Sequence, residues 1–170
     1  MSSKKYSKLI TKGRVFLFKI YSDGATSKNG YEDSVGGWAW ALIENDNCVD
    51  DNAQALAPAT NNQCELMAII DACETIEPRL GAFDKVEVYS DSAYIINCYK
   101  QFWWKGWVTK GWLNSKREPV KNRELWERLI PYFTDARFVF NKVKGHNGDR
   151  WNEYVDGLAV KARLDYVEGN

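Results

Sequence analysis

The sequence contains few of the residues that hold small secreted proteins or zinc proteins together. It has one histidine and four cysteines among its 170 residues. No two cysteines form a Cys-x2-Cys pair, and the histidine does not lie at metal-ligand spacing from any of them. We therefore expect reduced thiols in an intracellular protein, at Cys48, Cys64, Cys73 and Cys98.

Long apolar runs are also absent. No stretch is long enough to span a bilayer. The apolar run at residues 15–18 is too short for a signal peptide and follows too long a polar start. We therefore expect a cytoplasmic protein that does not enter a membrane, and we expect a monomer. The sequence also shows no internal repeat and no low-complexity segment.

The sequence also has no excess of positive or negative charge. The 23 basic and 23 acidic side chains give a formal net charge of zero, which excludes a strongly basic protein. A nucleic-acid partner stays open, because local patches of charge matter more than the total. Two segments are basic: residues 1–14, which contain no acid, and residues 100–121, which are also rich in tryptophan.

The length fits one domain with a full hydrophobic core. We expect a flexible basic arm over residues 1–14, a folded domain over residues 15–164 and a tail over residues 165–170. Apolar periodicity predicts strands at 15–23, 36–44, about 48–56, 85–91 and 137–143, and helices at 61–77, from about 92, at 122–132 and at 149–163. Residues 102–117 show neither a clean helical nor a clean strand pattern. This order predicts an α/β fold, a five-stranded mixed sheet with helices on both faces.

Two of the predicted strands end on an acid. Asp23 ends the first strand and Asp91 ends the fourth, each directly after a serine. If these strands are parallel neighbours, both carboxylates lie at the carboxyl edge of the sheet, where open α/β sheets bind ligands. Two acids there repel each other unless a proton or a cation lies between them, and we favour a cation. Glu65 and Asp156 lie beside the apolar stripes of two helices; taken alone, Glu65 is explained as a favourable acid near a helix N-terminus.

Five segments together resemble type 1 ribonuclease H, in that family's order and close to its spacing. They are YSDGA (21–25), TNNQCELMA (60–68), YSDSAY (89–94), PVKNRELW (119–126) and KGHNGDRWNEYVD (144–156). The resemblance runs from about residue 15 to residue 164. It implies a mixed sheet in the order 3-2-1-4-5 and endonucleolytic cutting of the RNA strand of RNA–DNA hybrids, which leaves 5′-phosphate and 3′-hydroxyl ends.

The resemblance also implies the catalytic residues. Two Mg²⁺ ions, or alternatively Mn²⁺, would be held by Asp23, Glu65, Asp91 and Asp156. Such a pair of ions activates water and neutralises the leaving oxygen, and Mg²⁺ prefers hard carboxylate ligands. By similarity, Asp23 bridges both ions, Asp156 completes the site that activates water, and Glu65 and Asp91 hold the ion at the leaving 3′-oxygen. His146, ten residues before Asp156, is linked in the family to proton handling and product release; a solvated loop histidine is the alternative.

Contacts with nucleic acid follow from the same resemblance. Residues along the RNA minor groove would recognise the 2′-hydroxyl group, which distinguishes RNA from DNA; they are Gly24, Asn62, Gln63 and the Glu65 carboxylate. The DNA strand would lie against residues 102–112, where Phe102, Trp103, Lys105, Trp107 and Lys110 offer rings and charges. Core packing of this tryptophan-rich run is the alternative. Further contacts are implied at Asn29, Thr60, Tyr94 and Asn122.

The sequence departs from the family at several positions. Pro58 stands where the phosphate pocket for the DNA strand has a basic residue, and Val108 and Thr109 replace residues that are often basic in bacterial members. Residues 28–35 form an unusual acidic turn beside the expected site. Two alternative functions remain at this stage: a DNA resolvase or transposase-type nuclease of the same fold, and a non-catalytic module that binds hybrids.

Overall fold

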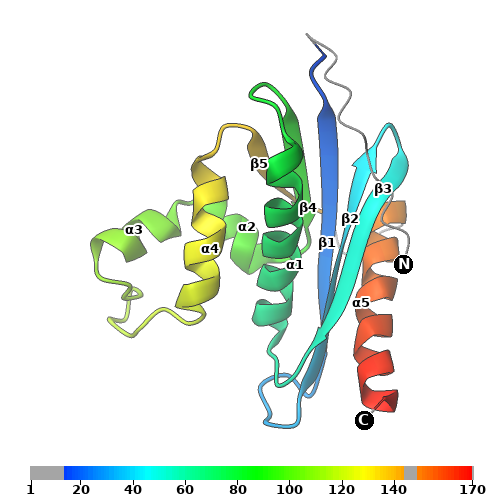
Figure 1. Ribbon diagram of the computed structural model, residues 1–170. Coiled ribbons are helices and arrows are strands. Elements are labelled where there is room, and N and C mark those ends of the chain that lie inside the picture. The colour runs from blue at the N-terminus through cyan, green and yellow to red at the C-terminus, as the bar shows by residue number, and fades with distance from the viewer. Residues whose placement is uncertain (1–13, 144–148, 170) are drawn as a thin grey trace.

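The computed structural model describes residues 14–143 and 149–169. Three strands come first and are followed by helices that alternate with two further strands (Figure 1). The strands are β1 (Leu17–Ser27), β2 (Val35–Glu44), β3 (Asn47–Leu56), β4 (Lys85–Ser90) and β5 (Phe138–Lys142). The helices are α1 (Asn61–Ile76), α2 (Ala93–Lys100), α3 (Trp103–Thr109), α4 (Arg123–Thr134) and α5 (Arg150–Glu168), with a 3-10 turn over Glu77–Arg79. The expected basic arm lies, apart from Arg14, outside the described residues.

The strands form one sheet in the order β3-β2-β1-β4-β5, which confirms the predicted order. The hairpins β1–β2 and β2–β3 are antiparallel, whereas β4 is parallel to β1 and β5 is parallel to β4. The first three strands are joined by short turns, and the parallel strands need helical crossovers, as the connection lengths require. β1 is therefore the central strand, as its apolar character on both sides predicts.

The sheet has helices on both faces, also as predicted: α1 and α4 lie on one face and α5 on the other (Figure 1). Neighbouring residues of β1 point to opposite faces. Ile20 joins the core under α1 and α4, whereas Tyr21 joins a second cluster with Val155 and Ala159 of α5. None of the helices in the described residues combines the length and the apolar character needed to cross a bilayer.

Helix α1 follows the local signals in its sequence. The Thr60 hydroxyl accepts a hydrogen bond from the Gln63 N–H, and Gln63 Oε1 accepts one from the Thr60 N–H, which is a complete capping box. Its predicted apolar stripe, from Leu66 to Ile76, is buried. Pro78 lies in the 3-10 turn that follows. The capping box fixes where α1 begins, and therefore where Glu65 lies.

Most element boundaries lie within two residues of the prediction, but two elements extend further. β1 continues to Ser27, four residues beyond Asp23, because β2 supplies hydrogen-bonding partners as far as Val35 and so overrides the strand-breaking tendency of Gly24. α5 continues to Glu168, five residues past its predicted end at residue 163, and an ion pair between Lys161 and Asp165 supports its last turns.

Helix α3 corrects the expectation that residues 102–117 contain no regular element. Gly106 and three tryptophans give this seven-residue helix a weak intrinsic preference. Tertiary packing compensates, because Trp107 is 9 % exposed and its ring makes an edge-on contact with the fully buried Trp126 of α4, with centroids 5.2 Å apart. Trp107 is therefore a core residue, which was the alternative to its expected contact with the DNA strand. Phe102, by contrast, is 54 % exposed.

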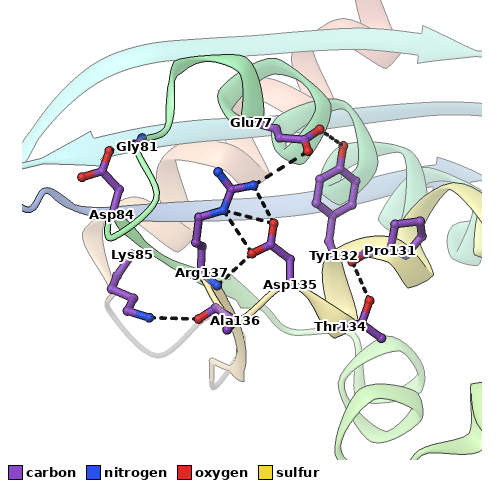
Figure 2. A network of polar contacts seen from close by, with 10 residues as sticks. All are labelled: Glu77, Gly81, Asp84, Lys85, Pro131, Tyr132, Thr134, Asp135, Ala136 and Arg137. Carbon is purple, nitrogen blue, oxygen red and sulfur yellow. Dashed lines mark hydrogen bonds and ion pairs between the residues drawn. The ribbon is translucent and has the colours of Figure 1, made fainter. Parts of the chain in front are cut away.

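A network of charged groups lies where β4 and β5 begin (Figure 2). Arg137 donates hydrogen bonds to both carboxylate oxygens of Asp135, at 2.6–3.1 Å, and its guanidinium lies 3.8 Å from Glu77 at the end of α1. The Tyr132 hydroxyl donates to Glu77 at 3.2 Å, and Lys85 donates to the Ala136 carbonyl oxygen at 3.0 Å. This network joins α1, α4, β4 and β5 at one end of the sheet.

Candidate active site

Strands β1 and β4 run side by side and then separate. Their parallel register ends with Ser22 opposite Ser90. β1 continues beside β2, whereas the chain after β4 turns into α2, whose N-terminus is capped by Ser92. Asp23 and Asp91 are therefore the first residues beyond the shared register. The two acids predicted at the carboxyl edge of the sheet lie together at this separation, which is where this class of sheet binds ligands.

Glu65 reaches the same place from α1. The approach is close because Gly24 lies against the start of this helix. A Cβ added at Gly24 would lie 2.7 Å from both the Cys64 Cβ and the Glu65 backbone nitrogen, which is nearer than real Cβ contacts allow. Gly24 is therefore needed for packing, in addition to the backbone contact with RNA that the resemblance implies.

Three of the four predicted acids form a compact cluster. Carboxylate oxygens of Asp23, Glu65 and Asp91 all lie within 4.8 Å of one another, a spacing that allows them to share a metal ion. Asp156, on α5, lies outside this trio but is near enough to act on Asp23 through its charge and through a side-chain contact. The structure thus brings acids from β1, α1 and α5, and from the end of β4, to one point.

The cluster is electrostatically strained in the absence of a cation. Burial, reinforced by the charge of Asp91, raises the pKa of Asp23 to about 7, although the Gly24 N–H donates a hydrogen bond to Asp23 Oδ1 at 2.8 Å. Burial also raises the pKa of Glu65 well above its ordinary value, and the charges of Asp23 and Asp91 add to this effect. The charged neighbours that raise these pKa values are all acids.

The donor set fits a hard divalent cation. Oε2 of Glu65 is buried and has no hydrogen-bond partner among the described residues, and leaving such an oxygen unsatisfied costs free energy. The ligand atoms that the described chain brings together here are carboxylate oxygens, the type that Mg²⁺ and Mn²⁺ favour. A cation among these oxygens would satisfy the unpartnered atom and remove the repulsion.

Several of the residues predicted to contact nucleic acid lie at the N-terminus of α1. Asn62 is exposed there. Asn29 accepts a hydrogen bond from the Asn61 N–H through its Oδ1 at 2.9 Å, and thus anchors the acidic turn of residues 28–35 on the helix. Gln63 and Thr60 are engaged in the capping box. The N–H groups and the dipole at this end of the helix favour a nearby anion.

A shallow hollow of about 520 Å³ lies between α1 and the start of α4. Its lining includes Gln63 and Met67 of α1 and Asn122 and Arg123 at the start of α4. Arg123, which follows Asn122, was not among the predicted site residues. Its guanidinium lies 5.1 Å from the centre of the Trp112 ring, and its Nε donates to Glu127 at 2.9 Å. The sequence did contain a signal for Arg123, since it is a basic residue directly after Asn122, a predicted contact with nucleic acid.

The residues predicted to contact nucleic acid around α3 differ in exposure. Phe102 and Lys105 are exposed, and the Lys105 ammonium lies 4.3 Å from the centre of the Phe102 ring. Lys110, just after α3, is also exposed. Trp107, by contrast, is buried in the aromatic core. Trp103 and Tyr94 are half-buried, and their rings contact each other.

The remaining predicted catalytic residue, His146, lies outside the described residues, as do its neighbours in the segment 144–148. The described chain resumes at Asp149, whose side chain caps α5 by accepting hydrogen bonds from the Trp151 and Asn152 N–H groups. Asp156 lies seven residues further along the same helix. The role expected for His146 stays a prediction.

Comparisons with known proteins agree with this geometry. The family model for RNase H matches residues 17–163. Over 143 residues the chain is 45 % identical to a ribonuclease H from Syntrophomonas wolfei, covering 84 % of this chain and 93 % of the relative. It is 39 % identical to a ribonuclease H from Chlorobaculum parvum, covering 82 % and 90 %.

The fold has counterparts among solved structures. One is the crystal structure of LC9-RNase H1, a type 1 RNase H with the type 2 active-site motif. It superposes with a TM-score of 0.72 at 24 % identity, covering 89 % of this chain and 74 % of that chain. At this identity the likeness concerns the fold, whereas the family match and the two sequence relatives cover most of the chain. The chain therefore belongs to the ribonuclease H family.

Proposed function

We propose that the chain is an endoribonuclease that hydrolyses the RNA strand of RNA–DNA hybrids with two divalent cations, and that it leaves 5′-phosphate and 3′-hydroxyl ends. The observation that carries the proposal is the convergence of Asp23, Glu65 and Asp91, with Asp156 beside them, where β1 and β4 separate. The family and its relatives named ribonuclease H support the choice of reaction.

The four acids would hold Mg²⁺, with Mn²⁺ as the alternative. When bound, such ions lower the pKa of water and neutralise charge on the leaving oxygen. Asp23 is suited to bridge two ions because it lies between the Glu65–Asp91 side and Asp156. The Gly24 N–H holds one Asp23 oxygen in place, so that the carboxylate is oriented before any ligand arrives.

The N-terminus of α1 is the proposed location of the RNA strand. Asn62 and Gln63 lie within the turn that precedes Glu65 and would reach the 2′-hydroxyl groups, which DNA lacks. Phe102, Lys105 and Lys110 present a ring and two cations for the DNA strand. Trp107 is left out of this proposed contact because its ring is buried. Arg123, in the hollow beside Asn122, offers a further cation for a phosphate.

His146 is proposed to handle protons near the attacking water and the products. It precedes α5, whose Asp156 would complete the cation site that activates water. An imidazole titrates near neutral pH and can therefore exchange protons under physiological conditions.

The test uses an end-labelled RNA–DNA hybrid, the same DNA sequence as a duplex, and the same RNA as a single strand. Each is incubated with the chain in the presence of Mg²⁺, of Mn²⁺ or of a chelator. We expect the RNA of the hybrid alone to be cut, only with a divalent cation, and to yield 5′-phosphate ends. Efficient cutting of the DNA duplex would favour the resolvase or transposase-type alternative. Tight hybrid binding without cutting under any condition would favour the non-catalytic module.

A further inference from the structure

Two consecutive glycines in β2, Gly36 and Gly37, lie between the two helices that carry active-site acids. They pair with Thr26 and Ala25 of β1, just beyond Asp23. Successive strand residues point to opposite faces of a sheet. Gly36 therefore faces α1, and Gly37 faces α5.

Both glycines are in close contact with a helix. A Cβ added at Gly36 would overlap the Cys64 sulfur and lie 2.9 Å from the Ala59 Cβ. A Cβ added at Gly37 would overlap the Ala159 carbonyl oxygen and lie 3.0 Å from the Arg163 nitrogen. Neither glycine is among the residues with positive φ in the described chain, so space, and not backbone conformation, requires glycine here.

The helix residues in contact are neighbours of the acids. Cys64 immediately precedes Glu65 in α1. Ala159 lies three residues after Asp156 in α5, which is close to one helical turn. A displacement of either helix at these contacts therefore moves an acid relative to Asp23, which is held in the central strand.

We propose that the Gly36–Gly37 pair positions the two catalytic helices, and thereby sets how far Glu65 and Asp156 lie from Asp23. Both are positioning residues, since they act through α1 and α5 without touching the reacting atoms. The inference rests on the proposed cation site. Gly37 is the more sensitive position, because the atoms that it meets belong to the backbone of α5 and cannot turn away as a side chain can.

The principal test is Gly37→Ala, with Mn²⁺ affinity measured by titration calorimetry and folding by thermal unfolding. The added methyl group forces α5 back by on the order of 1 Å to restore ordinary van der Waals separation. We expect the variant to fold cooperatively and to bind Mn²⁺ about 10- to 100-fold more weakly, the scale of losses when groups that orient metal ligands are changed. Gly157→Ala is the matched control, because it adds the same methyl group to α5 where no described atom beyond the adjacent helix backbone lies within 4 Å, and it should keep the parent's affinity.

A compensating substitution separates positioning from a general loss of stability. Asp156→Glu lengthens the side chain by one methylene, roughly 1.5 Å of bond length. We expect Asp156→Glu alone to weaken Mn²⁺ binding, and the double variant Gly37→Ala with Asp156→Glu to bind better than either single variant. Parent-like affinity in Gly37→Ala, or strictly additive losses in the double variant, would overturn the inference.

If Gly37→Ala does not fold, the α1 side of the pair decides. Gly36→Ala should weaken Mn²⁺ binding, and Cys64→Ala in the same chain should restore it by removing the overlapping sulfur. Unchanged affinity in Gly36→Ala would overturn the inference. If the parent chain binds no Mn²⁺, the proposed function is overturned, and the inference with it. If the parent binds Mn²⁺ and the glycine variants bind it equally well, only the inference is overturned.

Discussion

The two ends of the sheet both gather carboxylates, but in opposite electrostatic surroundings. At the end where β4 and β5 begin, Asp135 is held by Arg137, whose hydrogen bonds lower the pKa of that carboxyl (Figure 2). At the other end, burial and neighbouring acids raise the pKa of Asp23 to about 7. The Asp135 cluster contains its own cationic side chain, Arg137, whereas the charged side chains that raise the pKa values of Asp23 and Glu65 in the described chain are all acids.

This difference distinguishes a structural cluster from a functional one. The Arg137 network satisfies its charges internally and joins four elements, so its acids contribute to stability. The Asp23 cluster costs stability, since folding forces like charges together, and under the proposed function a bound cation would remove that cost. Substitutions should therefore have opposite consequences at the two ends.

The largest effect is expected from Asp23→Asn. Loss of one charge from the proposed bridging ligand should lower turnover by about 10⁴-fold or more, the scale seen when a central member of a catalytic group is removed. Hybrid affinity should persist, because the exposed groups around α3 and at the start of α1 are unchanged. Single-turnover rates at saturating hybrid and a binding titration measure the two quantities.

The matched control is Asp135→Asn at the opposite end. It removes a carboxylate charge from the Arg137 network and should leave turnover at the parent's value while lowering the unfolding temperature. Near-normal turnover in Asp23→Asn, or a comparable loss in Asp135→Asn, would remove the distinction between the two ends.

His146→Ala should have the next largest effect. Removal of a group that transfers protons should slow turnover by roughly 10²-fold, without abolishing it, because water can partly replace the imidazole. The variant should keep the parent's Mn²⁺ affinity, since His146 is not a proposed ligand. An unchanged steady-state rate would identify His146 as a solvated loop residue.

The pH dependence of stability should also distinguish the unpaired cluster. The pKa of Asp23 is raised in the folded chain to about 7, from about 4 in an unfolded one, so the folded state binds the proton more tightly. Its contribution is therefore present below about pH 4 and is lost as the pH rises towards 7, by roughly 1–3 kcal/mol. Urea unfolding in a chelator, for the parent and Asp23→Asn, measures this. We expect the variant's relative stability to increase with pH and the difference to shrink when Mg²⁺ is added.

At the paired end, Arg137→Met should destabilise the fold with no effect on chemistry. It leaves Asp135 and Glu77 without their shared cation, which should cost about 1–2 kcal/mol of unfolding free energy, since the pair is about one-fifth exposed. Urea unfolding and turnover on the hybrid measure the two effects. Lys161→Met removes a well-exposed ion pair with Asp165, which solvent screens, and should lower the stability much less than Arg137→Met. Equal losses in the two variants would show that the network has no special role.

The smallest effect concerns charges that belong to neither cluster. Lys105→Ala combined with Lys110→Ala should weaken hybrid binding and flatten the dependence of log affinity on log salt by about one to two units. Turnover at saturating hybrid should stay near the parent's value, because contacts with phosphates stabilise the bound ground state and the transition state equally. An unchanged slope in a salt titration would mean that these lysines do not meet phosphates.

Much of the fold was predictable because its signals are local. The alternation in β1, the apolar stripe of α1 and the Thr60 cap each arise within a few residues, and the structure confirms them. Asp23 and Asp91 were identified because a parallel sheet places the ends of its strands at one edge. The resemblance to a family then added Glu65 and Asp156, whose positions alone had structural explanations.

The features that escaped prediction depend on distant contacts. α3 is helical because Trp107 packs on Trp126, nineteen residues later in the chain, and its own sequence has no helical period. The pairing of Arg137 with Glu77 spans sixty residues. Gly36 and Gly37 lack side chains and leave no periodic signal, so their closeness to two helices appears only when the elements are assembled.

The capping box of α1 has a consequence for how Gln63 can recognise a substrate. Its Oε1 already accepts the Thr60 N–H at 2.9 Å, which fixes the orientation of the amide and leaves the NH₂ group as the part free to bind. Under the proposed function, Gln63 would therefore present its NH₂ donors to acceptors such as a 2′-hydroxyl oxygen, while Oε1 keeps one lone pair for a further hydrogen bond. The capping box that defines the start of the helix thus also fixes the orientation of the amide that would meet the substrate.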